Sequence, residues 1–178
     1  AIEAVHAQDY AGPVELVVVD DGSTDATAAV VARYPGVVHV RQQNAGPASA
    51  RNHGAIVAHG DILFFTDSDC RPERAWVSKM MKGFAREGVS VVAGSYGIAN
   101  TASPLARVIH AEIIFRHRAL MPEFPKAFGS YNFAVRRAAF EAAGGFNTQY
   151  RTASGEDNDL SYRIIARGGR ILFCRDAL

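Results

Sequence analysis

The stretch "GDILFFTDSDC" at residues 60–70 joins a strand-like run directly to two carboxylates. Ile62 to Thr66 is an unbroken series of mostly bulky residues, which is typical of a strand buried inside a sheet. Asp67 and Asp69 follow at once, one residue apart. In open α/β sheets, ligands bind in the crevice beyond the carboxyl ends of the strands. The stretch therefore predicts both an α/β sheet and a ligand site at its edge.

Similar apolar runs alternate with helix-like segments on both sides of this stretch. Strands are expected at 14–21, 37–42, 61–67 and 89–94, and helices at 1–10, 23–36, 46–60 and 71–88. In the last of these helices, Trp76, Met80 and Phe84 recur every four residues, as on the core-facing side of a helix. The alternation predicts an α/β fold of Rossmann type, with a mainly parallel sheet flanked by helices.

The second half of the chain is less regular. We expect a long helix at 101–121, a short strand and helix within 130–147, a helix at 154–169 and a final strand at 170–175. No linker is visible, so residues 1–178 are expected to form one domain. The chain opens inside a helix-like segment, whereas an open parallel sheet normally begins with a strand. We therefore expect a fragment of a longer protein.

The composition fits an ordinary globular domain, with 48% hydrophobic and 21% charged residues. The net charge is +1 and no basic block is present, so nothing indicates nucleic acid binding. No apolar run approaches the ~20 residues of a membrane span, and the first residues lack a signal-peptide pattern. Cys70 and Cys174 are far apart, which favours reduced thiols in a cytoplasmic compartment.

A second acidic pair, Asp20 and Asp21, follows the strand expected at 14–21. Parallel neighbours would bring it to the same edge as Asp67 and Asp69. Like charges ~4 Å apart repel by about 4 kcal/mol at an effective dielectric constant of ~20, so a proton, an arginine or a divalent metal must offset the repulsion. Oxygen-rich sites suit Mg²⁺ or Mn²⁺. An ordinary βα turn that begins at Asp21 would explain the second pair without chemistry.

A third acidic group lies in "SGEDNDL" at 154–160. Ser154 and Asp157 have the spacing of a capping box, and acids in the first turn of a helix are favoured by its dipole. One or two acids would satisfy such a cap, and three are present within four positions. If Asp157 points into the crevice instead, it is a candidate general base. Both interpretations remain open at this point.

Five blocks of this sequence occur in the order and spacing of family 2 glycosyltransferases, which are inverting enzymes of GT-A fold. The blocks that carry the resemblance are "VVVDDGSTD" (17–25), "NAGPASARNHG" (44–54), "GDILFFTDSDC" (60–70), "AAGGFN" (142–147) and "GEDNDLSYRI" (155–164). They span nearly the whole chain, which resembles the catalytic domain of that family. The resemblance implies a nucleotide-sugar-binding half at 1–100 and an acceptor-binding half at 101–178.

The same resemblance implies a role for each matching residue on the donor side. Asp20 or Asp21 would bind the nucleotide base or its ribose, and Arg51 would lie against the base. Asp67 would face the ribose. Asp69 would ligate a divalent metal, Mg²⁺ or Mn²⁺, that bridges the two phosphates of a UDP- or GDP-sugar.

On the acceptor side, the resemblance implies that Asp157 deprotonates the acceptor hydroxyl, and that Glu156 and the Gly145-Phe146 turn shape the acceptor pocket. Metal-stabilised departure of the diphosphate and one carboxylate on the opposite face suffice for a single displacement with inversion. The irregular segment 115–132 is the expected acceptor loop.

The family includes enzymes that act on carbohydrate, lipid or protein acceptors, often at a membrane. The expected location is the cytoplasm, with association at the inner face of the membrane through parts outside this chain. The alternative is a non-catalytic, nucleotide-binding fragment of such a domain. A DxD-type phosphatase is disfavoured because "DSDCRPE" does not match its pattern.

Overall fold

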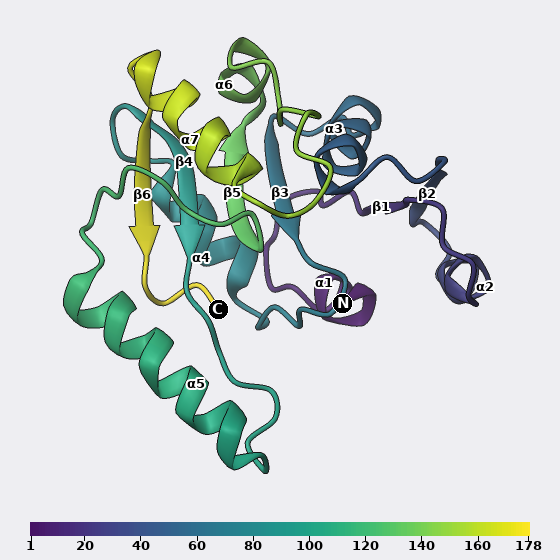
Figure 1. Cartoon of the computed structure of the whole chain (residues 1–178), viewed down its shortest axis with the longest axis horizontal. Helices are drawn as coiled ribbons and strands as arrows, with labels where there is room; N and C mark the ends of the chain where they lie inside the picture. Colours follow the sequence, from purple (N-terminus) through teal and green to yellow (C-terminus); the bar gives the residue numbers. More distant parts are fainter.

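The computed structural model describes all of residues 1–178 and is an α/β structure (Figure 1). The strands are β1 (Val17–Asp20), β2 (Val38–Arg41), β3 (Ile62–Thr66), β4 (Val89–Gly94), β5 (Asn132–Arg136) and β6 (Arg170–Cys174). The helices are α1 (Ile2–His6), α2 (Thr27–Val31), α3 (Pro47–Val57), α4 (Trp76–Gly83), α5 (Pro104–Phe115), α6 (Arg137–Ala142) and α7 (Glu156–Ala166), with a π-helical turn η1 (Arg116–Leu120) after α5. Every expected strand and helix is present, most of them shorter than predicted.

The strands form two sheets rather than one continuous layer. β1 and β2 pair in parallel, and the second sheet has the order β3-β5-β4-β6. In that sheet β4 and β6 are parallel, but β5 is antiparallel to both of its neighbours. The prediction of a mainly parallel sheet is right for β3, β4 and β6, which share one direction, and wrong for the hydrogen-bonded pairs that β5 makes.

The direction of β5 follows from the connection that precedes it. After β4 the chain leaves through α5 and η1 and re-enters the sheet without a crossover to the other end (Figure 1). A parallel strand would require such a crossover. A short buried run such as "NFAVR" reads the same in either direction, so the apolar pattern alone could not reveal the reversal.

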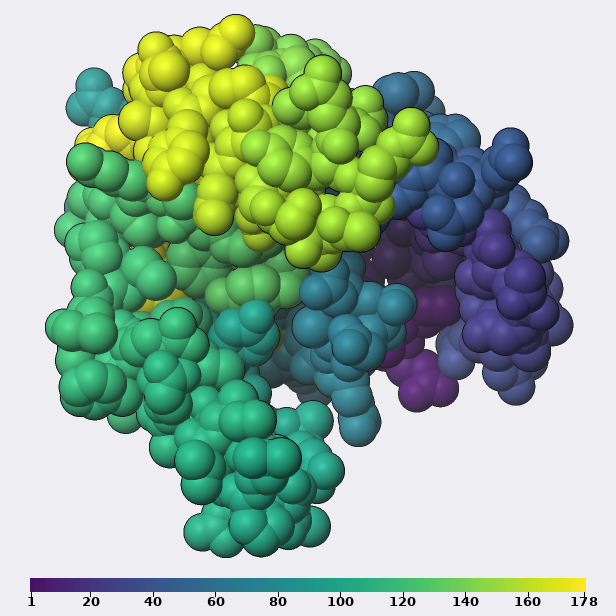
Figure 2. All heavy atoms as spheres, viewed as in Figure 1, coloured from purple at the N-terminus to yellow at the C-terminus, as the bar shows by residue number.

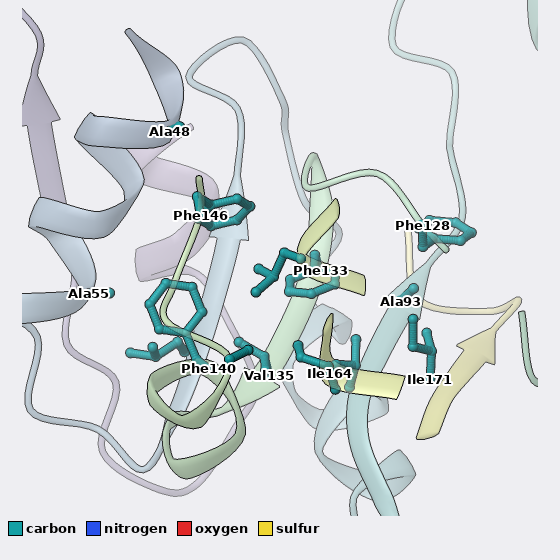
Figure 3. Packing of buried hydrophobic residues seen from close by; sticks show 14 of the residues in the cluster. Ala48, Ala55, Ala93, Phe128, Phe133, Val135, Phe140, Phe146, Ile164 and Ile171 are labelled. Atoms are coloured by element: carbon teal, nitrogen blue, oxygen red, sulfur yellow. The ribbon is translucent and has the colours of Figure 1, made fainter. Parts of the chain in front are cut away.

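Helices cover both faces of the four-stranded sheet and enclose two cores. On one face α3, α6 and α7 enclose a core of 15 buried residues, part of which is drawn in Figure 3. On the other face α4 contributes Trp76, Met80 and Phe84 to a smaller core, as their spacing predicted. Along β5, Phe133 faces the first core and Ala134 the second, as the two-residue period of a strand requires.

α5 differs from the other long helices because none of its residues is buried. Together with η1 it confirms the long helix expected at 101–121, and it stands out from the rest of the molecule (Figures 1 and 2). Its N-terminus is capped by Ser103, whose Oγ accepts the N–H of Ala106 at 3.3 Å. In this structure no helix combines the length and the apolar character that crossing a bilayer requires.

Candidate functional site

The acids that follow β3 form a compact group. A carboxylate oxygen from each of Asp67 and Asp69 and the Sγ of Cys70 all lie within 4.8 Å of one another. Burial raises the pKa of the Cys70 thiol, and the charges of the two carboxylates raise it further. Because a sulfur ligand is soft and Mg²⁺ and Mn²⁺ prefer oxygen, the two carboxylates are the suitable ligands for a hard divalent cation.

Arg51, on α3, provides the positive charge that the clustered acids require. Its Nη2 lies 3.3 Å from Asp67 Oδ1, and its Nη1 lies 2.8 Å from Glu156 Oε1. The guanidinium also lies over the ring of Phe146, 5.6 Å from the ring centroid. One arginine thus connects the end of β3 to the start of α7, which are 89 residues apart along the chain.

Glu156 is the most buried acid of the site, with only 2% of its surface exposed. Burial acts to raise its pKa, but hydrogen bonds from backbone N–H groups and from Arg51 outweigh burial, so the pKa lies below its usual value. Its Oε2 accepts the backbone N–H groups of Ser154 and Gly155 at 2.9 and 3.1 Å. This carboxylate therefore holds the first turn of α7 in place and remains charged.

The capping box predicted from Ser154 and Asp157 does not form. The residue that precedes α7 is Gly155, at φ +117°, and no side chain caps the helix. Ser154 Oγ instead donates to the Thr152 carbonyl at 3.1 Å. Glu156 takes the place of such a cap by accepting backbone N–H groups just before the helix. The side chain of Asp157 is therefore not used for capping.

Asp157 lines a hollow of about 230 Å³ together with Arg51, Asp67, Ser130, Tyr131, Ala153, Gly155 and Glu156. Its Oδ2 accepts the Ser130 N–H at 3.3 Å, and its Oδ1 accepts the Asn158 N–H at 2.8 Å. It is the one acid lining this hollow that has no cationic partner. Of the residues predicted from sequence, the structure thus brings Arg51, Asp67, Glu156 and Asp157 into one hollow, with Asp69 beside Asp67.

Asp20 and Asp21 lie at the end of β1 and are not among the residues that line this hollow. Asp20 is buried; its Oδ1 accepts the Ser23 N–H at 2.7 Å, and its Oδ2 has no hydrogen-bond partner. Hydrogen bonds from Ser23 are the main cause that lowers the pKa of Asp20, and the charge of Arg41 contributes. Asp20 is therefore an ionised, buried carboxylate whose Oδ2 makes no hydrogen bond but lies 3.7 Å from Arg41 Nε.

Asp21 instead holds the loop that leads into α3. It accepts hydrogen bonds from Gln42 Nε2 at 2.7 Å and from the N–H groups of Ala45 and Gly46, both at 2.9 Å. Since α3 carries Arg51, these bonds link the acids after β1 to the acids after β3. The turn expected to begin at Asp21 is instead bonded by Asp20, whose Oδ1 accepts the Ser23 N–H, and Asp21 is engaged in holding the loop before α3.

Gly145 and Phe146, predicted on the acceptor side, do not line the hollow. Phe146 is buried, packs against Phe65 and Phe140, and supports Arg51. Its backbone N–H and C=O bond the side-chain amide of Asn52 at 2.8 and 2.7 Å. An effect of this turn on the acceptor would therefore act through Arg51 and the adjacent helix α3, because the ring of Phe146 cannot reach a ligand.

Replacing Gly145 with alanine should destabilise the fold by about 2 kcal/mol more than replacing Gly144. Both glycines have positive φ, at +67° and +81°, so both substitutions strain the backbone. Only at Gly145 would a Cβ atom also meet Asn52 Oδ1, at 2.7 Å. Urea unfolding of the two variants measures the difference. Equal losses of unfolding free energy would show that the Asn52 side chain moves aside with no measurable loss of stability.

Sequence reasoning did not identify Ser130 and Tyr131 individually as site residues. They belong to the segment 115–132, which was predicted as an acceptor loop only from its irregular, aromatic composition. The structure brings them to Asp157 because β5 runs antiparallel, so the residues before β5 lie beside the end of β3. The sequence carries no sign that Ser130 and Tyr131 lie beside Asp157, because their position depends on the direction of β5.

The family model for glycosyl transferase family 2 matches residues 1–144 of this chain. The pre-mycofactocin glycosyltransferase of Mycobacterium tuberculosis is 31% identical over 168 residues, which cover 89% of this chain and 35% of that protein. The succinoglycan biosynthesis protein ExoO of Rhizobium meliloti is 33% identical over 185 residues, which cover 96% of this chain and 52% of that protein. The chain thus spans between about a third and a half of the length of these relatives.

Solved structures share the fold. The mannosyltransferase PcManGT from Pyrobaculum calidifontis, in complex with GDP-Man and Mn²⁺, has a TM-score of 0.74 and 24% identity, with 98% of this chain and 50% of that chain covered. S. aureus TarS 1-349 in complex with UDP has a TM-score of 0.73 and 20% identity, with 98% and 53% covered. These likenesses establish the GT-A fold, and the match to the family model, together with the acids that converge on one hollow, establishes that the chain belongs to glycosyl transferase family 2.

Proposed function

We propose that this domain transfers a sugar from a nucleoside-diphosphate sugar to an acceptor hydroxyl, with inversion at the anomeric carbon and with a divalent metal. The observation that carries the proposal is the hollow that Asp157 and Asp67 line together, with Arg51 paired to both Asp67 and Glu156. A single displacement needs one carboxylate on the donor side and another that takes the acceptor proton, and this hollow supplies both.

The residues at the end of β3 fit a divalent metal. Asp67 and Asp69 offer oxygen atoms within 4.8 Å of each other, and Mg²⁺ or Mn²⁺ commonly binds through one or two carboxylates plus substrate phosphates. Mn²⁺ is present with GDP-Man in the similar mannosyltransferase structure. When bound, the metal supplies positive charge that stabilises the departing diphosphate.

Asp157 is the proposed general base. Its carboxylate accepts only backbone N–H groups, so it can accept the proton of an acceptor hydroxyl. The acceptor oxygen then bonds to the anomeric carbon while the bond from that carbon to the diphosphate oxygen breaks. Glu156 and Asp67 are both paired with Arg51, so neither is free to act as a second nucleophile. This pairing favours inversion over a covalent sugar–enzyme intermediate.

The nucleotide is assigned to the side of β1 and α3. The Oδ2 of Asp20, which makes no hydrogen bond and lies 3.7 Å from Arg41 Nε, is the proposed acceptor for a donor group of the base or ribose. Arg51 and Asp67 would contact the nucleotide as the hollow fills, and Asp21 would contribute through the loop that it holds. UDP and GDP are the nucleotides found with the two similar structures, and both remain candidates.

The cytoplasmic location also stays a prediction, supported by two free cysteines.

A thermal-shift screen with UDP and GDP, each with and without Mn²⁺, tests this proposal. A nucleotide at about 100 times its Kd stabilises the folded state by about 2.7 kcal/mol. For a domain of this size, that stabilisation raises the Tm by about 5–10 °C. We expect a shift of this size with one nucleotide, larger when Mn²⁺ is present.

Asp69→Ala should abolish the Mn²⁺-dependent part of the shift. The matched control is Asp61→Ala, because Asp61 is an exposed acid at the opposite end of β3 and only its backbone carbonyl is bonded, by Arg137 N–H. An identical shift in wild type and Asp69→Ala would remove the metal from the proposal. A metal-dependent shift without sugar transfer would favour the alternative, a non-catalytic nucleotide-binding domain.

A further inference from the structure

Tyr131, which lines the hollow beside Asp157, is one of a pair of stacked aromatic rings. Its ring stacks on that of Tyr96, with centroids 4.1 Å apart and planes inclined by 16°. Burial, and then the charge of Asp67, raises the pKa of Tyr96 to about 12, which agrees with a phenol close to the end of β3. The stacked pair therefore forms a continuous aromatic wall that begins at the candidate active site.

A second hollow, of about 260 Å³, is lined by Tyr96, the other member of this stacked pair. Its other lining residues come from the following segment and from one face of α5: Gly97, Ile98, Ala99, Asn100, Ala106, Ile109, His110 and Ile113. No acid, lysine or arginine lines it, and six of its nine lining residues are hydrophobic. Such a lining is mostly apolar, with no permanently charged side chain, and favours an alkyl or aryl group.

α5 is an apolar helix that lacks the burial that its sequence would predict. Ile109 is 50% exposed although it lines the second hollow, and Leu105, Val108 and Phe115 are more than 60% exposed. The acid and arginine of this face, Glu112 and Arg116, neutralise each other at 2.7 Å. Exposed apolar surface of this extent on a helix indicates that an apolar ligand or partner covers it.

From this continuity we propose that the acceptor is an amphiphile, with its hydroxyl-bearing head at Asp157 and an apolar chain that runs over Tyr131 and Tyr96 into the hollow beneath α5. The inference rests on the proposed function and adds the chemical class of the acceptor. The second hollow is slightly smaller than the roughly 300 Å³ at which ordinary ligand sites begin. It therefore holds only the first part of the chain, and the remainder would lie along α5.

Binding of methyl, butyl and octyl β-glucosides tests the proposal, with each glycoside below its micellar concentration and with the nucleotide and Mn²⁺ present. Each methylene group that enters the second hollow should tighten binding about fourfold, since its burial contributes about 0.8 kcal/mol. We expect the octyl compound to bind at least tenfold more tightly than the methyl compound. Equal affinities for the two would overturn the proposal.

Variants of α5 locate the effect. Ile113→Gln, which changes the wall of the second hollow, should remove the preference for octyl glucoside, whereas Ile56→Gln, a matched change at an apolar residue of α3 that is 80% exposed and lines neither hollow, should preserve it. Ala106→Phe fills the hollow without adding polarity and should also remove the preference. An unchanged preference in both Ile113→Gln and Ala106→Phe would overturn the proposal.

The thermal shift caused by the nucleotide distinguishes a failure of this inference from a failure of the proposed function. If the Mn²⁺-dependent shift with UDP or GDP is present but chain length has no effect, only the amphiphilic acceptor is overturned. If the nucleotide shift is absent, the proposed function itself fails. Ile113→Gln and Ala106→Phe should leave the nucleotide shift unchanged, because neither residue lines the hollow that contains Asp157.

Discussion

Asp157→Asn should lower the rate of sugar transfer by about 10²–10⁴-fold, which is the usual contribution of a general base. Asparagine retains the shape of the side chain, and its Oδ1 can still accept the hydrogen bond from the N–H of Asn158. It cannot, however, take the proton of the acceptor hydroxyl. Because Asp157 does not bind the donor in this proposal, the Mn²⁺-dependent nucleotide shift should be unchanged. The effect should therefore appear in kcat, measured by release of the nucleoside diphosphate with a saturating acceptor.

Asp159→Asn is the matched control, since Asp159 lies two residues further along the same helix. Its Oδ2 accepts hydrogen bonds from Arg163 Nε and Nη2 at 2.9 and 2.6 Å, and it does not line the hollow. We expect transfer within about threefold of wild type and a stability loss below about 1 kcal/mol. A similar loss of transfer in both variants would mean that the charge of the first turn of α7, and not a base at Asp157, supports the reaction.

The sequence predicted the strand ends well because each end is marked by a change in chemistry. Asp67 and Asp69 follow a buried run, and the carboxyl end of such a strand is where a ligand site forms. The repulsion between clustered acids also led to the prediction that an opposing charge was needed. The structure supplies that charge with Arg51, one of the three possibilities that were left open.

Other features of the site could not be predicted because they depend on contacts distant in sequence. "SGEDNDL" has the local pattern of a capping box, yet the bond between Glu156 and Arg51 joins residues 105 positions apart and redirects the acids. Tyr131 reaches the hollow only because β5 is antiparallel. The stack of Tyr131 on Tyr96 joins two loops that no periodicity relates.

Arg51→Met should destabilise the fold by about 3 kcal/mol, because it leaves the buried carboxylate of Glu156 without its cation. Glu156 is 2% exposed, and the two backbone N–H groups that remain bonded to it offset only part of the loss. The matched control is Arg116→Met, which breaks an ion pair whose two side chains are each 57% exposed. That variant should change the free energy of unfolding, measured in urea, by less than about 0.5 kcal/mol.

The double variant Arg51→Met with Glu156→Gln shows whether the unpaired charge is the cause. Because the neutral amide can be buried at lower cost, the double variant should be more stable than Arg51→Met alone. A double variant as unstable as the sum of the single variants would contradict this and assign the loss to packing of Arg51 on Phe146.

The pH dependence of stability gives an independent measure of the same ion pair. The pKa of Glu156 is lower in the folded protein than the ordinary glutamate value of 4.5, so the unfolded chain binds the proton more tightly. The stabilisation is therefore complete above pH 4.5 and is lost as the pH falls through the folded-state pKa. In Glu156→Gln this loss should disappear, and the decline in stability on acidification should be shallower than in wild type. An unchanged slope would mean that other carboxylates control acid unfolding, and that the charge of Glu156 contributes little to holding α7 against α3.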